Sequence, residues 1–506
     1  MYKNILQYLE ATVCRCPDKL AFSDGETGMS FAELHSSARA VGTALCRRGV
    51  SSRPVAVFMK KSPAALAAFF GAVYAGCYYV PLDDEMPRHR IELILQKLDA
   101  AALICDADTE ASARRLPFEG ELCRFDDIVR DTAPDDAALG EIRRRQLDTD
   151  PIYVVFTSGS TGVPKGVVGC HRAVIDYIEG LCEVLSFDES TVFGNQTPLY
   201  FDACLKEIIP TLKYGATTYL IPKPLFMFPV KLVEYINAHG INTLCWVVSA
   251  LTMISSMHTF DKIKPDGLRL VAFASEVFPA RQLRIWCDTL PETRFVNLYG
   301  PTESTGICCY YEVPRDFDEN EPLPIGQPLP NTEILLLDEN NRVPPVGEQG
   351  EICVRGTRLT PGYYADNELT AKAFVQNPLN SLYPELIYRT GDIGRLDARG
   401  RLIFCGRRDY QIKHMGHRIE LGEIEAAASA NDAVETCCCL FDAEKQRVVL
   451  LYVGEVSSGA LTEYMKAKLP RYMLPNTVRQ LDEMPHTPNG KIDRKLLSGR
   501  ELNARR

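Results

Sequence analysis

The chain has 506 residues, of which 46% are hydrophobic and 24% are charged. Its length allows several domains, and its composition is typical of a soluble globular protein. The formal net charge is −10 at pH 7, and no block of basic residues stands out in the sequence. This balance argues against a nucleic-acid-binding surface, so we expect no nucleic-acid partner.

The 18 cysteines include the adjacent runs Cys308-Cys309 and Cys437-Cys438-Cys439. Adjacent cysteines make a poor disulfide framework, and a chain of this length builds a large core without such cross-links. Reduced thiols in a cytoplasmic protein are therefore expected. No paired C-x-x-C spacing occurs, and the two histidines at 414 and 417 lack further ligands nearby, which argues against a structural metal.

No signal peptide is visible at the N-terminus, and the longest apolar run covers residues 64–82. A membrane-spanning helix needs about 20 apolar residues. Because this run is rich in Ala and Gly, we expect a buried helix, a turn at Gly76 and a buried strand instead. No membrane partner is expected.

The first 105 residues alternate between helical and strand-like patterns. Leu34, Ala38, Val41 and Leu45 lie at helical spacing, and short apolar runs such as 55–58 favour strands. The expected elements are two helices flanking a strand at 19–23, a strand at 55–58, a helix at 62–74, a strand at 78–81, a helix at 88–98 and a strand at 102–105. This order predicts a parallel sheet covered by helices on both faces.

Residues 106–150 are polar and charged, and we expect a surface linker. The alternation resumes after them. The expected elements are a strand at 152–156, an apolar run at 167–168, helices at 171–185, 202–214, 230–238, 250–257 and 280–289, and strands at 193–197, 217–220, 243–247, 268–272 and 294–297. From 305 to 405 short strands with turns predominate, for example 333–337, 350–354 and 402–405. About a hundred residues of mixed α/β character follow from Gly406.

The most informative stretch is the loop Thr157-Ser158-Gly159-Ser160-Thr161-Gly162-Val163-Pro164-Lys165-Gly166. Its glycines permit positive φ angles and close backbone approach to a ligand. Its hydroxyls and N–H groups can donate to phosphate oxygens, and Lys165 adds a cation. Because Lys165 follows Pro164, this is not a Walker A loop, and neither G-x-G-x-x-G nor G-x-S-x-G fits. The pattern indicates triphosphate binding, with a flexible surface loop as the alternative.

A second segment, Asn297-Leu298-Tyr299-Gly300-Pro301-Thr302-Glu303, follows a predicted strand. Open α/β sheets bind ligands at the carboxyl ends of their strands. Glu303 is suited to Mg²⁺, Thr302 to a phosphate oxygen and Tyr299 to stacking on a base. The alternative is an ordinary turn after a strand.

Two further motifs follow. Asp392, in Tyr388-Arg389-Thr390-Gly391-Asp392, presents two acceptor oxygens that suit ribose hydroxyls. Lys491 follows the turn Pro488-Asn489-Gly490 near the C-terminus, a position that usually holds a solvated surface charge.

Taken in this order as far as Arg494, these motifs resemble the adenylate-forming superfamily of acyl-CoA synthetases, luciferases and nonribosomal-peptide adenylation domains. The similarity is greatest to the amino-acid-activating branch and the D-alanine:carrier-protein ligases. It implies an α/β fold: a large N-terminal domain, residues 1–408, with two βα-layered subdomains and a β-rich subdomain, and a small mobile α+β domain, residues 409–506. No carrier or condensation motif accompanies them, so we expect a free-standing enzyme.

The resemblance also assigns roles to residues. Lys491, Thr302 and Glu303 are the expected catalytic residues, Glu303 is the expected Mg²⁺ ligand, and Asp409 is the expected hinge. The residues expected to bind ATP are Thr157, Ser158, Gly159, Ser160, Thr161, Gly162, Lys165, Asn297, Tyr299, Gly300, Asp392, Phe404 and Arg407. One departure is His414-Met415-Gly416, where the family usually has Ile-Arg-Gly, which leaves the missing Arg's part in the second half-reaction open.

In amino-acid-activating relatives the residue matching Asp202 pairs with the substrate's α-ammonium group. The residues expected to bind substrate are Asp202, Ala203, Lys206, Cys245, Ala272, Ala274, Leu298, Gly306 and Ile307. Lys206 lies one turn from Asp202 and is the one charged member of the side-chain pocket. It either faces a substrate carboxylate, pairs with Asp202, or places its head in water.

The resemblance therefore implies ATP- and Mg²⁺-dependent formation of an aminoacyl-adenylate, followed by transfer to the phosphopantetheine thiol of a carrier protein in trans. Glutamate is the favoured substrate, ahead of aspartate, with a D-alanine or other small amino-acid ligase as the alternative. An acyl-CoA synthetase of the same fold is a rival, although fatty-acid relatives generally lack Asp202. A non-catalytic nucleotide-binding scaffold is the rival from another class.

Overall fold

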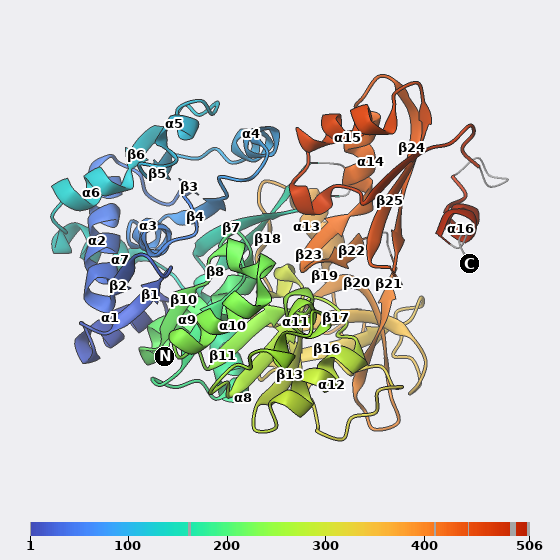
Figure 1. Cartoon of the computed structure of the whole chain (residues 1–506). Coiled ribbons are helices and arrows are strands. Elements are labelled where there is room, and N and C mark those ends of the chain that lie inside the picture. Colours follow the sequence, from blue (N-terminus) through green and yellow to red (C-terminus); the bar gives the residue numbers. More distant parts are fainter. Residues whose placement is uncertain (1, 160–162, 409–410, 444, 486–491, 503–506) are drawn as a thin grey trace. The chain divides into compact units, whose positions relative to one another are not determined.

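The protein is described by a computed structural model that covers residues 2–159, 163–408, 411–443, 445–485 and 492–502 (Figure 1). It divides into two compact units. The first, which we call the large unit, comprises Met1–Asp84, Leu98–Val155 and Gly166–Arg408. The second, the small unit, comprises Glu85–Lys97, Phe156–Lys165 and Asp409–Arg506.

A seven-stranded sheet has the order β18-β8-β7-β4-β3-β5-β6. Its strands are β3 (Pro54–Phe58), β4 (Tyr78–Leu82), β5 (Ala102–Cys105), β6 (Glu121–Arg124), β7 (Pro151–Thr157), β8 (Lys165–Cys170) and β18 (Gly362–Tyr363). The pairs β3–β4, β3–β5, β4–β7 and β5–β6 are parallel, as the alternation predicts. The helices of this region are α1 (Leu6–Arg15), α2 (Phe31–Arg47), α3 (Pro63–Tyr74), α4 (Arg88–Lys97), α5 (Glu110–Ala113), α6 (Phe125–Asp131) and α7 (Asp136–Arg145).

The apolar run at 64–82 forms helix α3, a turn and strand β4. Ser62 caps α3 by accepting a hydrogen bond from the Ala65 N–H, and Pro63 opens the helix. Nearly every residue of α3 is buried, as expected for a helix that is apolar on all sides. Gly76 has φ +71°, so the turn uses a conformation that favours glycine. No helix in the described ranges is long and apolar enough to cross a membrane.

A nine-stranded sheet has the order β15-β14-β13-β12-β11-β9-β10-β1-β2. Its strands are β1 (Leu20–Ser23), β2 (Gly28–Ser30), β9 (Val192–Asn195), β10 (Thr217–Leu220), β11 (Thr243–Val247), β12 (Leu270–Ala274), β13 (Arg294–Tyr299), β14 (Cys309–Glu312) and β15 (Gln327–Pro328). The strands from β13 to β1 pair in parallel, and antiparallel strands close both edges. The helices between these strands are α8 (His171–Leu185), α9 (Leu205–Tyr214), α10 (Pro229–Ala238), α11 (Val248–Ser256) and α12 (Ala280–Thr289).

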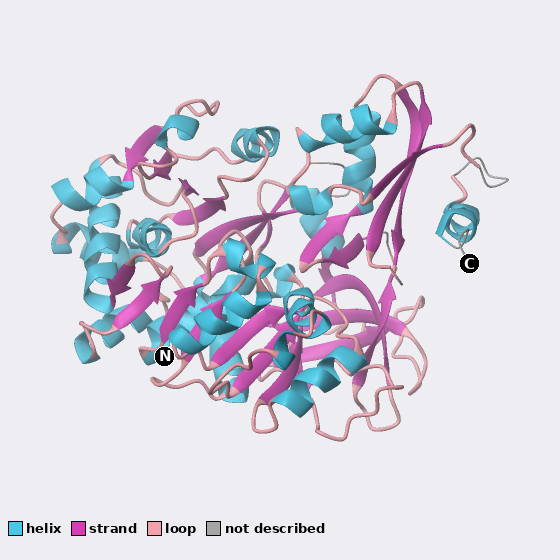
Figure 2. Ribbon diagram, viewed as in Figure 1, coloured by secondary structure: helices cyan, strands magenta, loops and turns pink. Residues whose placement is uncertain are grey.

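The remainder of the large unit is antiparallel. Its five-stranded sheet has the order β16-β17-β20-β19, with β21 paired to β20. Figure 2 draws the strands of the chain in magenta and the helices in cyan. The elements are β16 (Thr332–Leu337), β17 (Gly350–Gly356), α13 (Asn367–Ala373), β19 (Phe374–Gln376), β20 (Leu386–Leu396) and β21 (Leu402–Arg407). The two βα sheets and this β-rich part confirm the expected fold class.

The C-terminal part of the small unit is α+β. It contains β22 (Gln411–His414), β23 (His417–Glu420), α14 (Leu421–Ser429), β24 (Val434–Asp442), β25 (Arg447–Gly454), α15 (Ser458–Lys466), β26 (Thr477–Gln480) and α16 (Arg494–Leu497). Strands β24, β25 and β26 form one sheet, and β22 pairs with β23. Ile424 of α14, Leu450 of β25 and Leu461 of α15 belong to one buried cluster, so this part has its own core.

The surface linker expected at 106–150 is wrong. The segment contains α5, β6, α6 and α7, and β6 extends the seven-stranded sheet in parallel with β5. Its buried apolar side chains are Ala113, Cys123, Phe125, Ile128 and Leu139. Composition misled the prediction because the many charged residues pair locally at the surface while these few apolar residues supply the packing.

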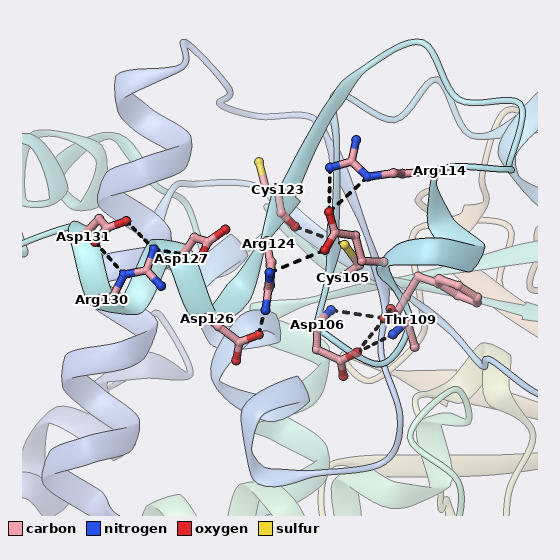
Figure 3. Close-up of polar contacts among 12 residues, drawn as sticks. Cys105, Asp106, Thr109, Arg114, Cys123, Arg124, Asp126, Asp127, Arg130 and Asp131 are labelled. Atoms are coloured by element: carbon pink, nitrogen blue, oxygen red, sulfur yellow. Dashed lines mark hydrogen bonds and ion pairs between the residues drawn. The ribbon is translucent and has the colours of Figure 1, made fainter.

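Figure 3 shows how the charged residues of this segment bond to one another. Asp106 accepts from the Thr109 N–H at 2.8 Å and from its hydroxyl at 2.7 Å, which fixes the turn after β5. Arg124 at the end of β6 lies 3.6 Å from Glu110 and 3.4 Å from Asp126. On α6, Arg130 pairs with Asp127 at 2.9 Å and with Asp131 at 2.8 Å.

Candidate functional site

The turn after strand β13 brings several candidate residues to the carboxyl end of the nine-stranded sheet. A Cβ at Gly300 would lie 2.0 Å from the Gly306 carbonyl oxygen, so only glycine fits there. The Cys308 N–H donates to the Tyr299 carbonyl at 2.8 Å, which closes the turn. Between these points Thr302–Ser304 form a short 3₁₀ helix. The chain therefore doubles back and presents Thr302 and Glu303 at the sheet edge.

Tyr299, Asp392 and Arg407 form one buried polar group. Asp392 and Arg407 are register partners on β20 and β21. The Tyr299 hydroxyl donates to Asp392 Oδ2 at 2.5 Å, and the Arg407 guanidinium donates to Oδ1. Burial, together with the Asp392 charge, raises the pKa of Tyr299 well above its ordinary value. The group thus joins three residues predicted to bind nucleotide, and Tyr299 contributes a hydroxyl contact that sequence reasoning did not foresee.

The two other nucleotide candidates on these strands lie close to this group. The Phe404 ring lies 6.5 Å from the Tyr299 ring, centroid to centroid, at a tilt of 40°. The Asn297 side chain donates to the Pro324 carbonyl at 2.8 Å, so it supports the neighbouring loop.

Glu303 is fully buried, and the Tyr363 hydroxyl donates to its Oε1 at 2.7 Å. The Thr360 N–H donates to the Glu303 carbonyl at 3.0 Å. No group of three or more His, Cys, Asp or Glu side chains that could hold a metal occurs in the described part of the chain. One anchored carboxylate suits Mg²⁺, which usually binds through one or two carboxylates and substrate phosphates. Sequence reasoning noted Gly362-Tyr363 only as a weak family match and missed the contact to Glu303.

Asp202 lies in a 3₁₀ turn, Asp202–Cys204, directly before α9. It is buried, and the Thr302 hydroxyl donates to its Oδ1 at 3.2 Å. Burial raises the pKa of Asp202 to about 6, and the negative charge of Glu303 acts in the same direction. The proposed ammonium-binding and catalytic residues therefore meet although a hundred residues separate them in the sequence.

Several residues expected to line the side-chain pocket lie on one face of three adjacent strands, β11, β12 and β13. Cys245 on β11 is the register partner of Ala272 on β12, and Ala274 lies two residues further along the same face. These residues, together with Leu298 and Ile307, belong to the same buried cluster. The alternate residues Trp246 and Phe273 belong to the cluster on the other face. Five of the expected pocket residues are thus brought together, and most are small.

Lys206 is 2% exposed. Its ammonium donates to the Ala203 carbonyl at 2.9 Å. Within the described residues no carboxylate lies within 4 Å of this ammonium, so neither the Asp202–Lys206 ion pair nor the solvated lysine is present. A single carbonyl acceptor leaves a buried ammonium with donors unsatisfied.

Sequence reasoning missed three residues beside Lys206. Glu207 is fully buried, and Asn195 at the end of β9 donates to its Oε2. The Asn195 carbonyl in turn accepts from the Lys61 ammonium at 2.9 Å. Burial raises the pKa of Glu207 to about 7 and lowers that of Lys61 to about 8. The available signal was the charged pair Lys206-Glu207 directly before the apolar run Ile208-Ile209-Pro210.

The glycine-rich loop belongs to the small unit. The Ser158 hydroxyl donates to the Arg418 carbonyl at 2.9 Å, and the Gly159 N–H donates to Glu423 Oε2 at 3.1 Å. Lys165 lies 4.0 Å from Glu420. A Cβ at Gly159 would lie 2.1 Å from the Val163 carbonyl oxygen, which explains the need for glycine. The acidic partners Glu420 and Glu423 were not foreseen.

Thr157 is buried, and its hydroxyl has no hydrogen-bond partner within the described ranges. Five predicted residues lie outside those ranges: Ser160, Thr161, Gly162, Asp409 and Lys491. All 18 cysteines lie inside them and are free thiols.

The sequence profile of the AMP-binding enzyme family matches residues 9–364, which is more than half of the chain. The profile of the AMP-binding enzyme C-terminal domain matches residues 423–491. The chain belongs to the AMP-binding enzyme family. It is thereby classed with the AMP-forming ligases.

Two curated relatives are similar to this chain over nearly its whole length. Tyrocidine synthase 1 of Brevibacillus parabrevis is 32% identical over 99% of this chain and 45% of its own length. Zwittermicin A synthase ZmaJ of Bacillus cereus is 30% identical over 98% of this chain and 94% of its own length. The chain therefore spans less than half of the first relative and nearly all of the second.

A solved structure supports the fold over almost the whole chain. Holo-PA1221, described as an NRPS protein containing adenylation and PCP domains bound to a vinylsulfonamide inhibitor, superimposes with a TM-score of 0.80. The two proteins are 25% identical, and the match covers 98% of this chain and 84% of the other.

Proposed function

We propose that this AMP-binding enzyme activates an acidic amino acid, glutamate ahead of aspartate. In the first step the α-carboxylate attacks the α-phosphorus of ATP, which releases pyrophosphate and forms an aminoacyl-adenylate. In the second step the phosphopantetheine thiol of a carrier protein attacks the adenylate and releases AMP.

The observation that carries the choice of amino acid is the buried Lys206 ammonium, with one carbonyl acceptor and no described carboxylate within 4 Å. A bound glutamate would place its ammonium at Asp202 and its side-chain carboxylate at Lys206. Glu207 faces both Lys206 and Lys61, of which Lys206 acts more strongly, and Asn195 links Glu207 to Lys61. With bound glutamate the substrate's ammonium offsets Asp202 and its side-chain carboxylate adds a counter-charge for Lys206, whereas a neutral amino acid would bring no such carboxylate.

The remaining catalytic roles follow from the family and fit the geometry described above. Asp392 and Arg407 are suited to the ribose, with Tyr299 and Phe404 beside them. Glu303 is the proposed Mg²⁺ ligand, and Thr302 is proposed to donate to a phosphate oxygen. Catalysis then depends on positioning and charge neutralisation of the phosphates.

Transfer to a carrier protein is supported by the relatives. Holo-PA1221 contains a PCP domain in addition to its adenylation domain. We propose that this chain meets its carrier in trans, and that residues 409–506 turn about Asp409 between the two steps, with Lys491 acting only in the first.

One competing assignment has an observation in its favour. Ala203, Ala272, Ala274 and Gly306 are small, so a pocket lined by them also suits a small amino acid such as alanine. The assignment to a small amino acid leaves the buried ammonium of Lys206 without a counter-charge from the substrate, and we rank this assignment second.

The test is ATP–pyrophosphate exchange with the purified chain and each of the twenty amino acids. Glutamate should give the highest rate, and Lys206→Met should lose glutamate selectively by at least about tenfold in kcat/KM. Lys213→Met is the matched control, because Lys213 lies on the same helix and already has a carboxylate partner, the exposed Glu179. Preference for alanine or an aromatic amino acid, with Lys206→Met unchanged, would contradict the proposal.

A further inference from the structure

Tyr177 on α8 is a buried residue with an unused hydrogen-bonding group. Its side chain is 0% exposed, and its hydroxyl has no hydrogen-bond partner in the described part of the chain. Buried hydroxyls normally have a partner, so an exception requires an explanation. Tyr177 is not among the residues expected from the sequence to contact substrate.

The Tyr177 hydroxyl lies beside the expected side-chain pocket. A Cβ built on Gly306 would lie 2.9 Å from Tyr177 Cζ and 3.1 Å from its hydroxyl oxygen. Gly306, which has φ +90°, thus leaves the space that this ring occupies. Tyr153 is also buried, and its hydroxyl has no hydrogen-bond partner among the described residues, but its ring packs on Gly169, which is not an expected pocket residue.

A buried cation, Arg358, contacts the backbone next to Gly306. Arg358 is 0% exposed and donates to the Ile307 carbonyl at 3.0 Å and to the Pro330 carbonyl at 2.7 Å. It holds in place the backbone next to Gly306. Asp176 lies 3.3 Å from the terminal nitrogen of Arg358 that also donates to Pro330.

Tyr177 is a hydrogen-bond donor at neutral pH. Burial raises its pKa well above the ordinary value, and the Asp202 charge raises it further. A protonated phenol without an acceptor, next to a pocket, is complementary to an anionic or strongly accepting group on a ligand.

We propose that Tyr177 is a specificity-determining residue whose hydroxyl donates a hydrogen bond to the side-chain carboxylate of the bound amino acid. The inference rests on the proposed function and deepens it. Lys206 from α9 and Tyr177 from α8 would then each take one oxygen of that carboxylate. Together they favour glutamate over its uncharged analogues.

The test is Tyr177→Phe, which removes the hydroxyl and keeps the ring. In pyrophosphate exchange the KM for glutamate should rise by about tenfold or more, as expected for a lost hydrogen bond to a charged group. The KM for ATP and the slow exchange with alanine should not change, because neither uses this hydroxyl. Tyr235→Phe is the control, because the Tyr235 hydroxyl is also buried with no hydrogen-bond partner in the part of the chain that the structure describes, but it lies against Gly25, which is not a pocket residue.

The outcomes separate the two proposals. If the wild type activates glutamate and Tyr177→Phe leaves its KM unchanged, the role of Tyr177 is refuted and the proposed function stands. Equal losses for glutamate and alanine also refute it, since they indicate a packing role. A wild type that prefers no acidic amino acid refutes the proposed substrate itself, whatever the variant does.

Discussion

Asp202 has to be charged to bind an ammonium group, yet its burial favours the protonated form. Its pKa is raised to about 6, because the hydrogen bonds from Thr302 and the Ala203 backbone and the charge of Lys206 only partly offset the burial. A bound ammonium would stabilise the carboxylate and lower this pKa again. Asp202 is thus suited to a positively charged ligand, and its charged form is less stable when no ligand is bound.

This predicts a pH dependence. In the free enzyme kcat/KM for the amino acid should fall about tenfold per unit below pH about 6, because protonated Asp202 cannot pair with the ammonium. The KM for ATP should stay nearly constant over the same range. Pyrophosphate exchange measured from pH 4.5 to 8 at subsaturating glutamate checks this, and an acid limb that starts only below about pH 4.5 contradicts it.

The same pKa has a consequence for stability. The folded-state value lies above the ordinary value, so the folded protein binds the proton more tightly than the unfolded chain does. Ionisation of Asp202 therefore opposes folding, and this destabilisation develops as the pH rises from about 4 to about 6. Asp202→Asn, which cannot ionise, should remove this part of the pH dependence of the melting temperature.

At the scale of elements, the start of α9 carries an unusual density of buried charge. Lys206 and Glu207 follow the 3₁₀ turn that holds Asp202, and Lys61, which follows strand β3, reaches the same region through Asn195. Neighbouring positions on a helix point in different directions, which lets Lys206 and Glu207 serve different partners. Lys61 shares with Lys206 the stabilisation of the Glu207 carboxylate.

Lys61→Met should therefore weaken glutamate binding although Lys61 is not an expected pocket residue. Without Lys61, Glu207 has only Lys206 as a counter-charge, so the KM for glutamate should rise by about tenfold while that for ATP is unchanged. Glu207→Gln in the same chain should restore the KM, because it removes the competing carboxylate. A double variant no better than Lys61→Met alone would count against this arrangement.

The segment from α5 to α7 shows a different property of elements. Its charged residues form local pairs such as Arg124 with Asp126, and Ile128 and Leu139 supply burial. Such pairs contribute little stability each, so the few apolar contacts and the pairing of β6 with β5 must hold the segment in place.

At the scale of the whole molecule, the chain divides after Arg408, and the small unit also includes the glycine-rich loop. The division coincides with the residue proposed as hinge, Asp409. The family's two-step reaction requires different surroundings for the adenylate in each step. A lysine near the C-terminus, Lys491, is proposed to serve only the first.

Lys491→Ala should accordingly reduce adenylate formation by at least about a hundredfold, since it removes a cation from the phosphoryl-transfer site. Thiolation of a pre-made aminoacyl-adenylate should remain close to the wild-type rate. Single-turnover assays of each half-reaction measure this, with Lys495→Ala, four residues further along, as control. Equal loss in both half-reactions would show that Lys491 has no step-specific role.

Much of the fold could be read from local patterns. The strands at 243–247 and 294–297 and the helix at 171–185 match the observed elements within two residues, because alternating or periodic apolar residues determine which face is buried. The need for glycine at 159 was likewise implied by the loop. The resemblance also named Cys245, Ala272, Ala274 and Leu298 as pocket residues, and the structure has them on β11, β12 and β13.

Contacts between distant segments could not be predicted from local sequence patterns. Nothing local indicates that Thr302 meets Asp202, that Tyr299 donates to Asp392, or that the Tyr177 ring fills the space left by Gly306. Local propensity governs how each segment folds, whereas these contacts depend on how sheets and helices pack across a hundred residues or more. The sequence alone was sufficient for the family and for most elements outside 106–150, and packing determined which buried charges and hydroxyls are left for a ligand.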